Sequence, residues 1–281
     1  MRGDGIRARK ALGQNFLTDR SVLSRIAALV SAGTGERVLE IGPGKGALTS
    51  YLAEQAGRLV AVELDDRLVP LLRGSFADNP RVTIIEGDIL DLDIRETLAR
   101  YGTPPWKVAA NLPYNISTPV LFRLLDVRDL FTRLVLMLQK EVGDRLAAGP
   151  GGKEYGVLSV LFQLHFDVTR ELLVRPGSFH PVPKVDSVVL SFVPLAQPRV
   201  DVGDEDYFRR VVKASFAMRR KTLWNCLKGG ALGVPTDGIR DALARCGIDE
   251  GRRGETLSLQ EFALLTKGLL AAGGTLPPRA P

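Results

Sequence analysis

The chain is poor in cysteine and histidine, with two of each among its 281 residues. The spacing of Cys226 and Cys246 fits neither a disulfide framework nor a zinc site. His165 and His180 are too few for a His-based metal cluster, and a Ser-His-Asp hydrolase would need one of them correctly placed. We therefore expect a protein without a metal centre.

Long apolar runs are also missing, since no uninterrupted span approaches the roughly 20 residues of a membrane helix. The N-terminus is polar and basic with no hydrophobic segment after it, so we expect no secretory signal, no membrane association and a cytoplasmic location. Apolar residues at 45% and charged residues at 25% allow a sizeable core. The net charge of +6 favours an anionic partner such as nucleic acid, although an ordinary basic protein would fit as well.

Buried-strand patterns alternate with helical patterns over the first half of the chain. The expected strands cover residues 37–41, 59–63, 82–86, 108–111 and 133–139. The expected helices cover residues 19–32, 47–56, 67–76 and 120–125, the first with Asp19 or Thr18 as its N-cap. Such alternation predicts an α/β fold with a parallel sheet and crossover connections. A further stretch, Val185–Val193, alternates like an edge or hairpin strand.

The remainder of the chain predicts a second, smaller domain. Residues 205–270 have helical patterns without convincing strands, and Pro194–Pro198 resembles a linker. We expect a first domain over 1–195 that includes a basic N-terminal arm, an all-helical domain over 196–272, and a disordered tail over 273–281. Boundaries within residues 157–174 cannot be set, because helix and strand patterns overlap there.

Three expected strand ends carry residues suited to an adenosine ligand. Gly42, Gly44 and Gly46 follow the first strand, where glycines permit a tight turn and close approach to a ligand. Glu63 ends the second strand and could accept from ribose hydroxyls, and Asp88 after the third could accept from an adenine amine. The Gly-x-Gly-x-Gly spacing departs from both dinucleotide and phosphate-binding loops. S-adenosylmethionine therefore fits, the alternative being a plain strand-to-helix turn with solvated acids.

The tetrapeptide Asn111-Leu112-Pro113-Tyr114 lies at the end of the fourth strand, where a substrate amine would meet the cofactor. The Asn111 amide oxygen and backbone carbonyls held by Pro113 can accept from the N–H groups of an exocyclic amine, which makes its lone pair available. We predict that Tyr114 and Phe179 stack on the two faces of a flipped base. A proline-containing loop with a core tyrosine is the alternative interpretation.

The excess positive charge is concentrated in one segment. Residues 207–228 hold seven basic residues and no acidic one, so this segment alone exceeds the net charge of the chain. If the segment is helical, an apolar face lies beside a basic face that carries Arg209, Lys213 and Arg220. The apolar face consists of Phe208, Val212, Phe216 and Leu223. A solvated helix face is the alternative to phosphate binding. The candidate RNA-binding residues are Arg209, Lys213, Arg219, Arg220 and Lys221.

Several motifs together resemble the small-subunit ribosomal RNA adenine N6,N6-dimethyltransferases, over nearly the whole chain. These motifs are Leu12-Gly-Gln-Asn-Phe-Leu17, Glu40-Ile-Gly-Pro-Gly-Lys-Gly46, Glu86-Gly-Asp88, Asn111-Leu-Pro-Tyr114, Tyr155-Gly-Val-Leu-Ser-Val160, Phe179-His-Pro-Val-Pro-Lys-Val-Asp-Ser187 and Arg219-Arg-Lys-Thr-Leu223. Trp224 departs from the family, whose members often continue the last motif with a basic residue, and this puts one RNA contact in doubt.

The resemblance implies a Rossmann-like S-adenosylmethionine-dependent methyltransferase sheet with a small C-terminal helical domain. It implies two methyl groups on each of two adjacent adenines near the 3′ end of small-subunit ribosomal RNA, transferred during subunit maturation. The first domain would then be catalytic and the second RNA-binding. The cofactor contacts that it implies come from Asn15, Leu17, Gly42, Glu63, Asp88 and Asn111.

Other functions remain open at this stage. A resistance-type methyltransferase of large-subunit RNA would share the cofactor and base motifs, although the 179–187 and 219–223 motifs favour the small subunit. A DNA adenine methyltransferase is less well supported, because no separate recognition domain is visible. An RNA-binding assembly factor with secondary activity is a third possibility, but both Glu63 and Asn111 are present. We expect a monomer, since no dimer-forming stripe stands out.

Overall fold

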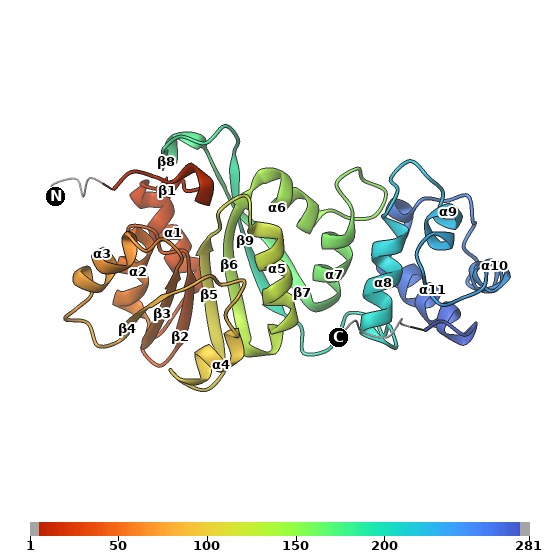
Figure 1. The fold of residues 1–281 in the computed structure, drawn as a ribbon, viewed down its shortest axis with the longest axis horizontal. Helices are drawn as coiled ribbons and strands as arrows, with labels where there is room; N and C mark the ends of the chain where they lie inside the picture. Colours follow the sequence, from red (N-terminus) through yellow and green to blue (C-terminus); the bar gives the residue numbers. More distant parts are fainter. Residues whose placement is uncertain (1–5, 276–281) are drawn as a thin grey trace. The chain divides into compact units, whose positions relative to one another are not determined.

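The computed structural model describes residues 6–275, which form two compact units (Figure 1). The first unit contains residues 6–143 and 167–194, and the second contains residues 144–166 and 195–275. The sequence-based boundary had left residues 144–166 with the first domain. The structure groups them with the C-terminal helices, because α7 (Val157–His165) packs against α8 (Glu205–Ser215).

The first unit is built on a seven-stranded sheet in the order β4-β3-β2-β5-β6-β9-β7. The strands are β2 (Arg37–Ile41), β3 (Arg58–Glu63), β4 (Val82–Glu86), β5 (Trp106–Asn111), β6 (Phe131–Gln139), β7 (Phe166–Val174) and β9 (Ser187–Pro194). The five strands from β4 to β6 in this order are parallel, as the sequence predicted. The sequences of these strands are continuous apolar runs, because helices cover both faces of a parallel sheet.

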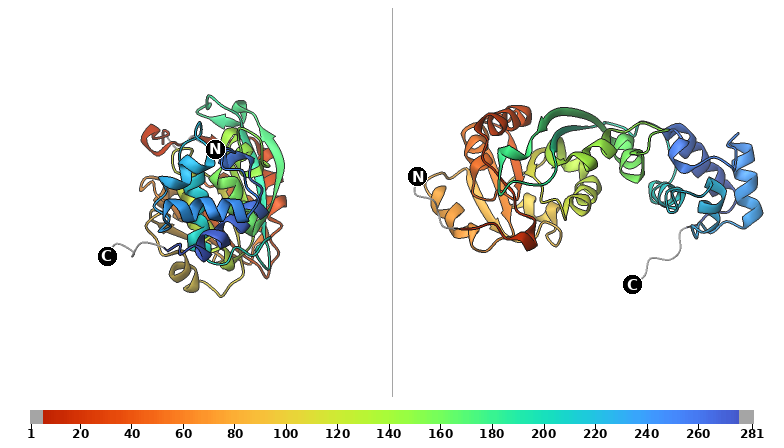
Figure 2. Two further views of the ribbon diagram at one scale, coloured as in Figure 1. Left: turned by 90° about the vertical axis from the view of Figure 1, so that its right-hand side faces the viewer. Right: turned by 90° about the horizontal axis from the view of Figure 1, so that it is seen from above.

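Helices α1 and α2 lie on one face of this sheet and α5 on the other (Figure 2). The helices of this unit are α1 (Arg20–Val30), α2 (Ala47–Gln55), α3 (Leu68–Ser75), α4 (Ile94–Ala99), α5 (Ser117–Asp126) and α6 (Lys140–Ala147), the last of which continues into the second unit. Asp19 is the N-cap of α1, where its carboxylate accepts from the amides of Ser21 and Val22 at 3.0 and 3.3 Å. This confirms one of the two predicted caps.

Three parts of the fold correct or complete the sequence prediction. The 185–193 stretch was expected as an edge or hairpin strand, but β9 lies inside the sheet, antiparallel to β6 and flanked on its other side by β7. The edge assignment was wrong because β7 continues the sheet beyond β9, and residues 187–192 are buried on both faces despite their alternating pattern. The ambiguous residues 157–174 contain α7 followed directly by β7. A separate two-stranded sheet pairs β1 (Phe16–Leu17) with β8 (Phe179–His180).

The second unit is helical, as expected for the C-terminal part of the chain. Besides α7 and α8 it contains α9 (Leu223–Lys228), α10 (Thr236–Arg245) and α11 (Leu259–Ala271). The Phe216 ring lies 6.0 Å from the ring centroid of Tyr155 and 5.8 Å from that of Phe262, which ties these elements into one core. The basic segment is helical only in part, because α8 ends at Ser215 and residues 216–222 form a loop.

Arg2 of the expected basic arm and residues 276–281 of the expected tail lie outside the described residues. Over residues 6–275, every helix is too short or too polar to cross a bilayer. The same residues contain no group of three or more His, Cys, Asp and Glu side chains placed to hold a metal ion.

Candidate active site

A cavity of about 770 Å³ opens at the carboxyl ends of the parallel strands β2, β3, β4 and β5. Its wall comes mainly from residues 12–18, 40–48, 62–64, 87–89 and 111–116. Ligands of open α/β sheets bind at this edge, because the loops that follow the strands leave a crevice there. The structure therefore brings the N-terminal segment and all the predicted cofactor residues to a single cavity.

The glycine loop after β2 has the left-handed backbone that its composition predicts. Gly42 and Gly44 have φ values of +67° and +60°, which favour glycine strongly. A Cβ atom on Gly42 would meet nothing within 4 Å, so the backbone is exposed to the cavity at that point. A Cβ atom on Gly44 would lie 3.1 Å from the Phe16 ring, so the N-terminal segment packs directly on this loop.

Glu63 ends β3 at the wall of the cavity and is 5% exposed. Its carboxylate accepts from the backbone amides of Gly44 at 2.9 Å and Asp65 at 2.8 Å, and burial raises its pKa. These two bonds fix the orientation of the carboxylate, and each oxygen keeps a lone pair that a hydroxyl could donate to. The structure thus places Glu63 as predicted, and contact with a ribose stays a prediction.

Asp88 lies just beyond β4 on the same wall. Its Oδ1 atom accepts from the backbone amide of Leu90 at 2.8 Å, which holds the side chain in the turn after the strand. The neighbouring Ile89 is 5% exposed and also lines the cavity, so an apolar surface lies beside the carboxylate. An aromatic base with an amino group fits this combination, although recognition of adenine by Asp88 stays a prediction.

Asn111 is oriented by the N-terminal segment. Its side-chain nitrogen donates to the backbone carbonyl of Asn15 at 3.1 Å. A carbonyl can only accept, so the amide must present its nitrogen to Asn15, and its oxygen Oδ1 is left for a ligand in the cavity. The backbone amide of Leu112 donates to Met137 at 3.1 Å, which fixes the start of the following loop on β6.

The N-terminal segment is anchored by a buried carboxylate that the sequence analysis did not single out. Asp65 is 0% exposed and accepts from the Gln14 side chain at 2.8 Å, while Arg9 lies 3.1 Å from it. Hydrogen bonds from Arg67 hold the pKa of Asp65 well below its ordinary range. The Leu-Gly-Gln-Asn-Phe-Leu motif, which contains Gln14, could have drawn attention to this anchor. The sequence around Asp65 contains no pattern that indicates it.

Glu40 is a second residue that sequence reasoning missed, although it belongs to a motif quoted above. It is the last residue but one of β2, lines the cavity and is 2% exposed. Among the described residues, none forms a hydrogen bond with its Oε2 atom, and burial raises its pKa to about 8. A buried polar atom without a partner at the wall of a cavity is available to a ligand.

The predicted aromatic pair is not brought together at the cavity. Tyr114 lines the cavity and is half-buried, whereas Phe179 is 2% exposed and belongs to the core cluster with Leu17. The two residues Leu17 and Phe179 are direct partners in the β1–β8 pair. In this structure Phe179 therefore packs in the core beside Leu17, a residue of the N-terminal segment that lines the cavity. Its stacking on a base stays a prediction that requires the ring to leave the core.

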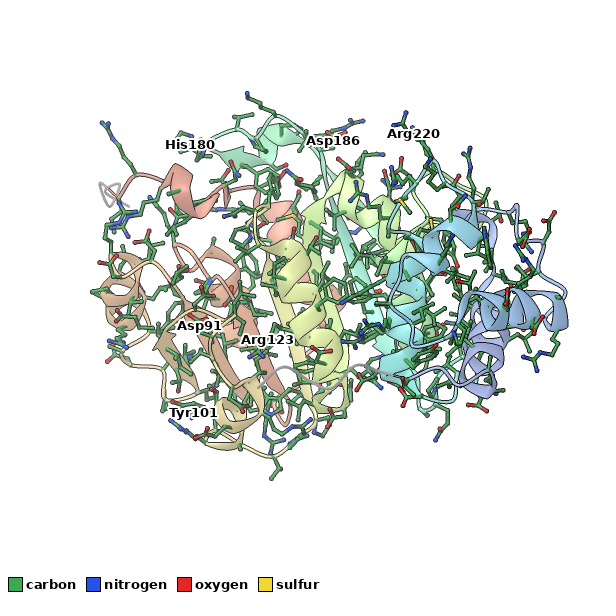
Figure 3. All side chains as sticks on the ribbon, turned by 45° about the vertical axis from the view of Figure 1, so that its right-hand side comes forward. Asp91, Tyr101, Arg123, His180, Asp186 and Arg220 are labelled. Carbon is green, nitrogen blue, oxygen red and sulfur yellow. The ribbon has the colours of Figure 1, made fainter. Side chains whose placement is uncertain are left out.

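The candidate RNA-binding residues lie in the second unit, some in a helix and the others in a loop. Arg209 and Lys213 belong to α8, whereas Arg219, Arg220 and Lys221 lie in the loop between α8 and α9. All three loop residues are exposed, and Figure 3 shows Arg220 extending outward from its loop. Arg219 donates to the backbone carbonyl of Lys153 at 3.3 Å, which ties the loop to the segment before α7.

Comparisons with known proteins agree with this arrangement. The sequence profile of ribosomal RNA adenine dimethylases matches residues 5–267. The chain is 94% identical over 276 residues to ribosomal RNA small subunit methyltransferase A of Geobacter sulfurreducens, which spans 98% of this chain and 100% of that protein. It is similar to the crystal structure of a dimethyladenosine transferase from Plasmodium falciparum, with a TM-score of 0.79, 26% identity, and coverage of 92% of this chain and 98% of the other.

A 23S ribosomal RNA methyltransferase has the same fold, with a TM-score of 0.69, 24% identity, and coverage of 91% of this chain and 99% of the other. At that identity the likeness concerns the fold alone.

Proposed function

The chain belongs to the ribosomal RNA adenine dimethylase family, and we propose that it dimethylates the N6 amino groups of two adjacent adenines near the 3′ end of small-subunit ribosomal RNA. S-adenosylmethionine is the methyl donor. The observation that carries this proposal is the single cavity that brings together Glu63, Asp88 and Asn111.

The residues present fit S-adenosylmethionine. The backbone at Gly42 is open to the cavity, Glu63 is held with lone pairs available, and Asp88 lies beside the apolar Ile89. The unpartnered Oε2 atom of Glu40 adds a polar position on the same wall. When bound, the cofactor supplies a methyl group on a positively charged sulfur, which an amine lone pair can attack.

The residues at the end of β5 and in the loop that follows it act on the substrate amine. Oδ1 of Asn111 and a backbone carbonyl near Pro113 would accept from the two N–H groups of the adenine N6. These hydrogen bonds favour a nitrogen whose lone pair is withdrawn from the ring and directed at the methyl carbon. The cofactor would supply the methyl group, and the proton that the amine loses would leave to solvent from the nitrogen that Asn111 orients. No general base is needed, which agrees with the small number of histidines.

The basic residues of the second unit would hold the RNA backbone. Lys213 and the loop residues Arg219, Arg220 and Lys221 belong to a segment with seven basic and no acidic residues. Arg209 lies one turn before Lys213 in α8. Lysine and arginine side chains neutralise phosphates without reading sequence, so these contacts would position the RNA while the shape of the subunit supplies selectivity.

The partner that we propose is the immature small subunit, bound in the cytoplasm by a monomer that uses no metal. The large-subunit alternative is disfavoured because the 94% identical relative is named for the small subunit. A purely structural assembly factor is disfavoured because the cavity keeps Glu63 and Asn111 in place. Binding during assembly and methyl transfer are compatible, since the first uses the basic segment and the second uses the cavity.

The direct test is incubation of the protein with labelled methyl donor and immature small or large subunits that lack the modification, followed by mapping of the labelled nucleotides. The proposal predicts four methyl groups on two adjacent adenines near the 3′ end of the small-subunit RNA. Label on large-subunit RNA, or on adenines elsewhere in the small subunit, would contradict it.

A further inference from the structure

The hydroxyl of Tyr114 lies 2.7 Å from Oγ of Ser187, and either atom could be the donor. Tyr114 belongs to the loop after β5 and lines the cavity, whereas Ser187 is the first residue of β9 and is 0% exposed. The bond therefore joins the loop that faces the substrate amine to the end of the 179–187 motif. That motif is the one whose aromatic residue, Phe179, is buried away from the cavity.

The two ends of Tyr114 are held by different parts of the first unit. At the backbone end, the carbonyl of Tyr114 accepts from Oγ of Ser117 at 3.1 Å, and the carbonyl of Pro113 accepts from the amide of Ile116 at 3.2 Å. These bonds fix the loop, but rotation about the side-chain bonds of Tyr114 would still move the ring. The bond from the hydroxyl to Ser187 removes that freedom.

Ser187 is itself held firmly by the sheet. It pairs with Gln139 at the end of β6, and the backbone amide of Lys140 donates to the carbonyl of Asp186 at 2.9 Å. The Asp186 carboxylate pairs with Arg175 at 2.8 Å, which fixes the residue just before β9 from its other side. Figure 3 shows His180 and Asp186, which lie on either side of the loop that leads into β9.

We propose that Ser187 is a positioning residue that holds the Tyr114 ring where a flipped adenine stacks on it. Ser187 is not among the described residues that line the cavity, so it acts through Tyr114 and does not contact the substrate. The inference rests on the proposed function, because stacking presupposes a base as the substrate. It gives the 179–187 motif a role in methyl transfer that does not require Phe179 to leave the core.

The test is a double-mutant cycle on unmethylated small subunits, with Tyr114→Phe, Ser187→Ala and the double variant. Each single change should lower kcat/KM about 2- to 12-fold, the factor that one neutral hydrogen bond corresponds to. The kcat/KM of the double variant should be no lower than that of the more impaired single variant, because both substitutions break the same bond. The dissociation constant of the methyl donor should stay unchanged in all three, since the contact lies on the substrate side.

A matched control is Ser191→Ala. Ser191 lies in the same strand, is 4% exposed, and its hydroxyl donates to Glu171 at 2.5 Å, so this variant also removes a hydrogen bond made by a buried serine of β9. A loss of stability alone would affect both serine variants. The proposal expects kcat/KM to fall for Ser187→Ala and to remain at the wild-type value for Ser191→Ala.

The contact can also be tested without RNA. In protein with ¹³C-labelled tyrosines, of which the chain has five, Tyr114→Phe identifies the ring signals of Tyr114. Ser187→Ala should shift and broaden these signals, and Ser191→Ala should leave them unchanged. Unaltered Tyr114 signals in Ser187→Ala would overturn the proposal, as would losses of kcat/KM that multiply in the double variant. A wild-type protein that methylates no small-subunit RNA would refute the proposed function instead, and the ring signals would still decide the role of Ser187.

Discussion

The side-chain nitrogen of Asn111 lies 3.1 Å from the backbone carbonyl oxygen of Asn15, 96 residues earlier in the chain. This bond decides which atom of the Asn111 amide is available to a substrate, because the carbonyl requires a donor opposite it. The N-terminal segment therefore does more than cover the cofactor cavity. It also sets the polarity of the amide that we propose receives the substrate amine.

The contact between Gly44 and Phe16 predicts that Gly44→Ala weakens donor binding. The new residue would keep φ near +60°, which costs about 1–2 kcal/mol for a residue other than glycine, and its Cβ atom would lie 3.1 Å from the Phe16 ring. Gly74→Ala is the matched control, since Gly74 lies in α3 with nothing within 4 Å of the added atom. Calorimetric titration with donor should show weaker binding for the first variant and wild-type affinity for the second.

The anchor of the N-terminal segment predicts different effects at two neighbouring aspartates. Asp65→Asn replaces a fully buried carboxylate that binds Gln14 and Arg9, so the segment should loosen and donor affinity should fall by about 10-fold, or ~1.4 kcal/mol. Asp66→Asn removes a surface pair with Arg9, whose contribution should be within about 0–1 kcal/mol. Equal donor affinities in the two variants would argue against the anchor.

Burial of Glu40 predicts a pH dependence of stability. Its pKa is raised from 4.5 to about 8, so the folded protein keeps a proton that the unfolded chain loses. The free energy of unfolding should therefore fall as the pH rises from 4.5 towards 8, with a slope of at most ~1.4 kcal/mol per pH unit from this group. Glu40→Gln is neutral at every pH and should flatten that fall. Urea titrations across this range test it, and parallel pH profiles for the two proteins would refute it.

The basic loop predicts a change in the salt dependence of RNA binding. The triple variant with Arg219, Arg220 and Lys221 replaced by alanine should bind immature subunits more weakly, and the slope of log K against log salt should drop by about one unit per lost phosphate contact. A variant with Arg73, Arg95 and Arg100 replaced by alanine loses the same charge from exposed positions in the first unit. The same drop in slope for both variants would mean that total charge, and not the loop, holds the RNA.

The sequence predicted most of the fold because each element carries its own periodic signal. Val22, Ile26 and Val30 of the predicted first helix are all buried in α1, and Asp19 caps it as expected. The predicted cofactor residues lie together because parallel strands end at one edge, so strand order was enough to group them.

The misplaced residues are those whose position depends on contacts between distant segments. Residues 187–192 alternate in pattern, yet they are buried on both faces, and β9 is not an edge strand because β7 continues the sheet beyond it. The apolar spacing around Phe216 suggested a longer helix, but the Phe216 ring packs in a core with Tyr155 and Phe262. Asp65 was overlooked because its partners Gln14 and Arg9 precede the glycine loop in the sequence, whereas Asp65 follows it.

The most direct test of the account is single-turnover methyl transfer to immature small subunits by Asn111→Ala, with donor affinity measured in parallel. Removal of one hydrogen-bond acceptor from a reacting centre should slow transfer by about 100-fold or more. Donor binding should be reduced far less, because Glu63 and Asp88 remain on the cavity wall. Transfer at the wild-type rate in this variant would contradict the claim that the cavity activates an amine through Asn111.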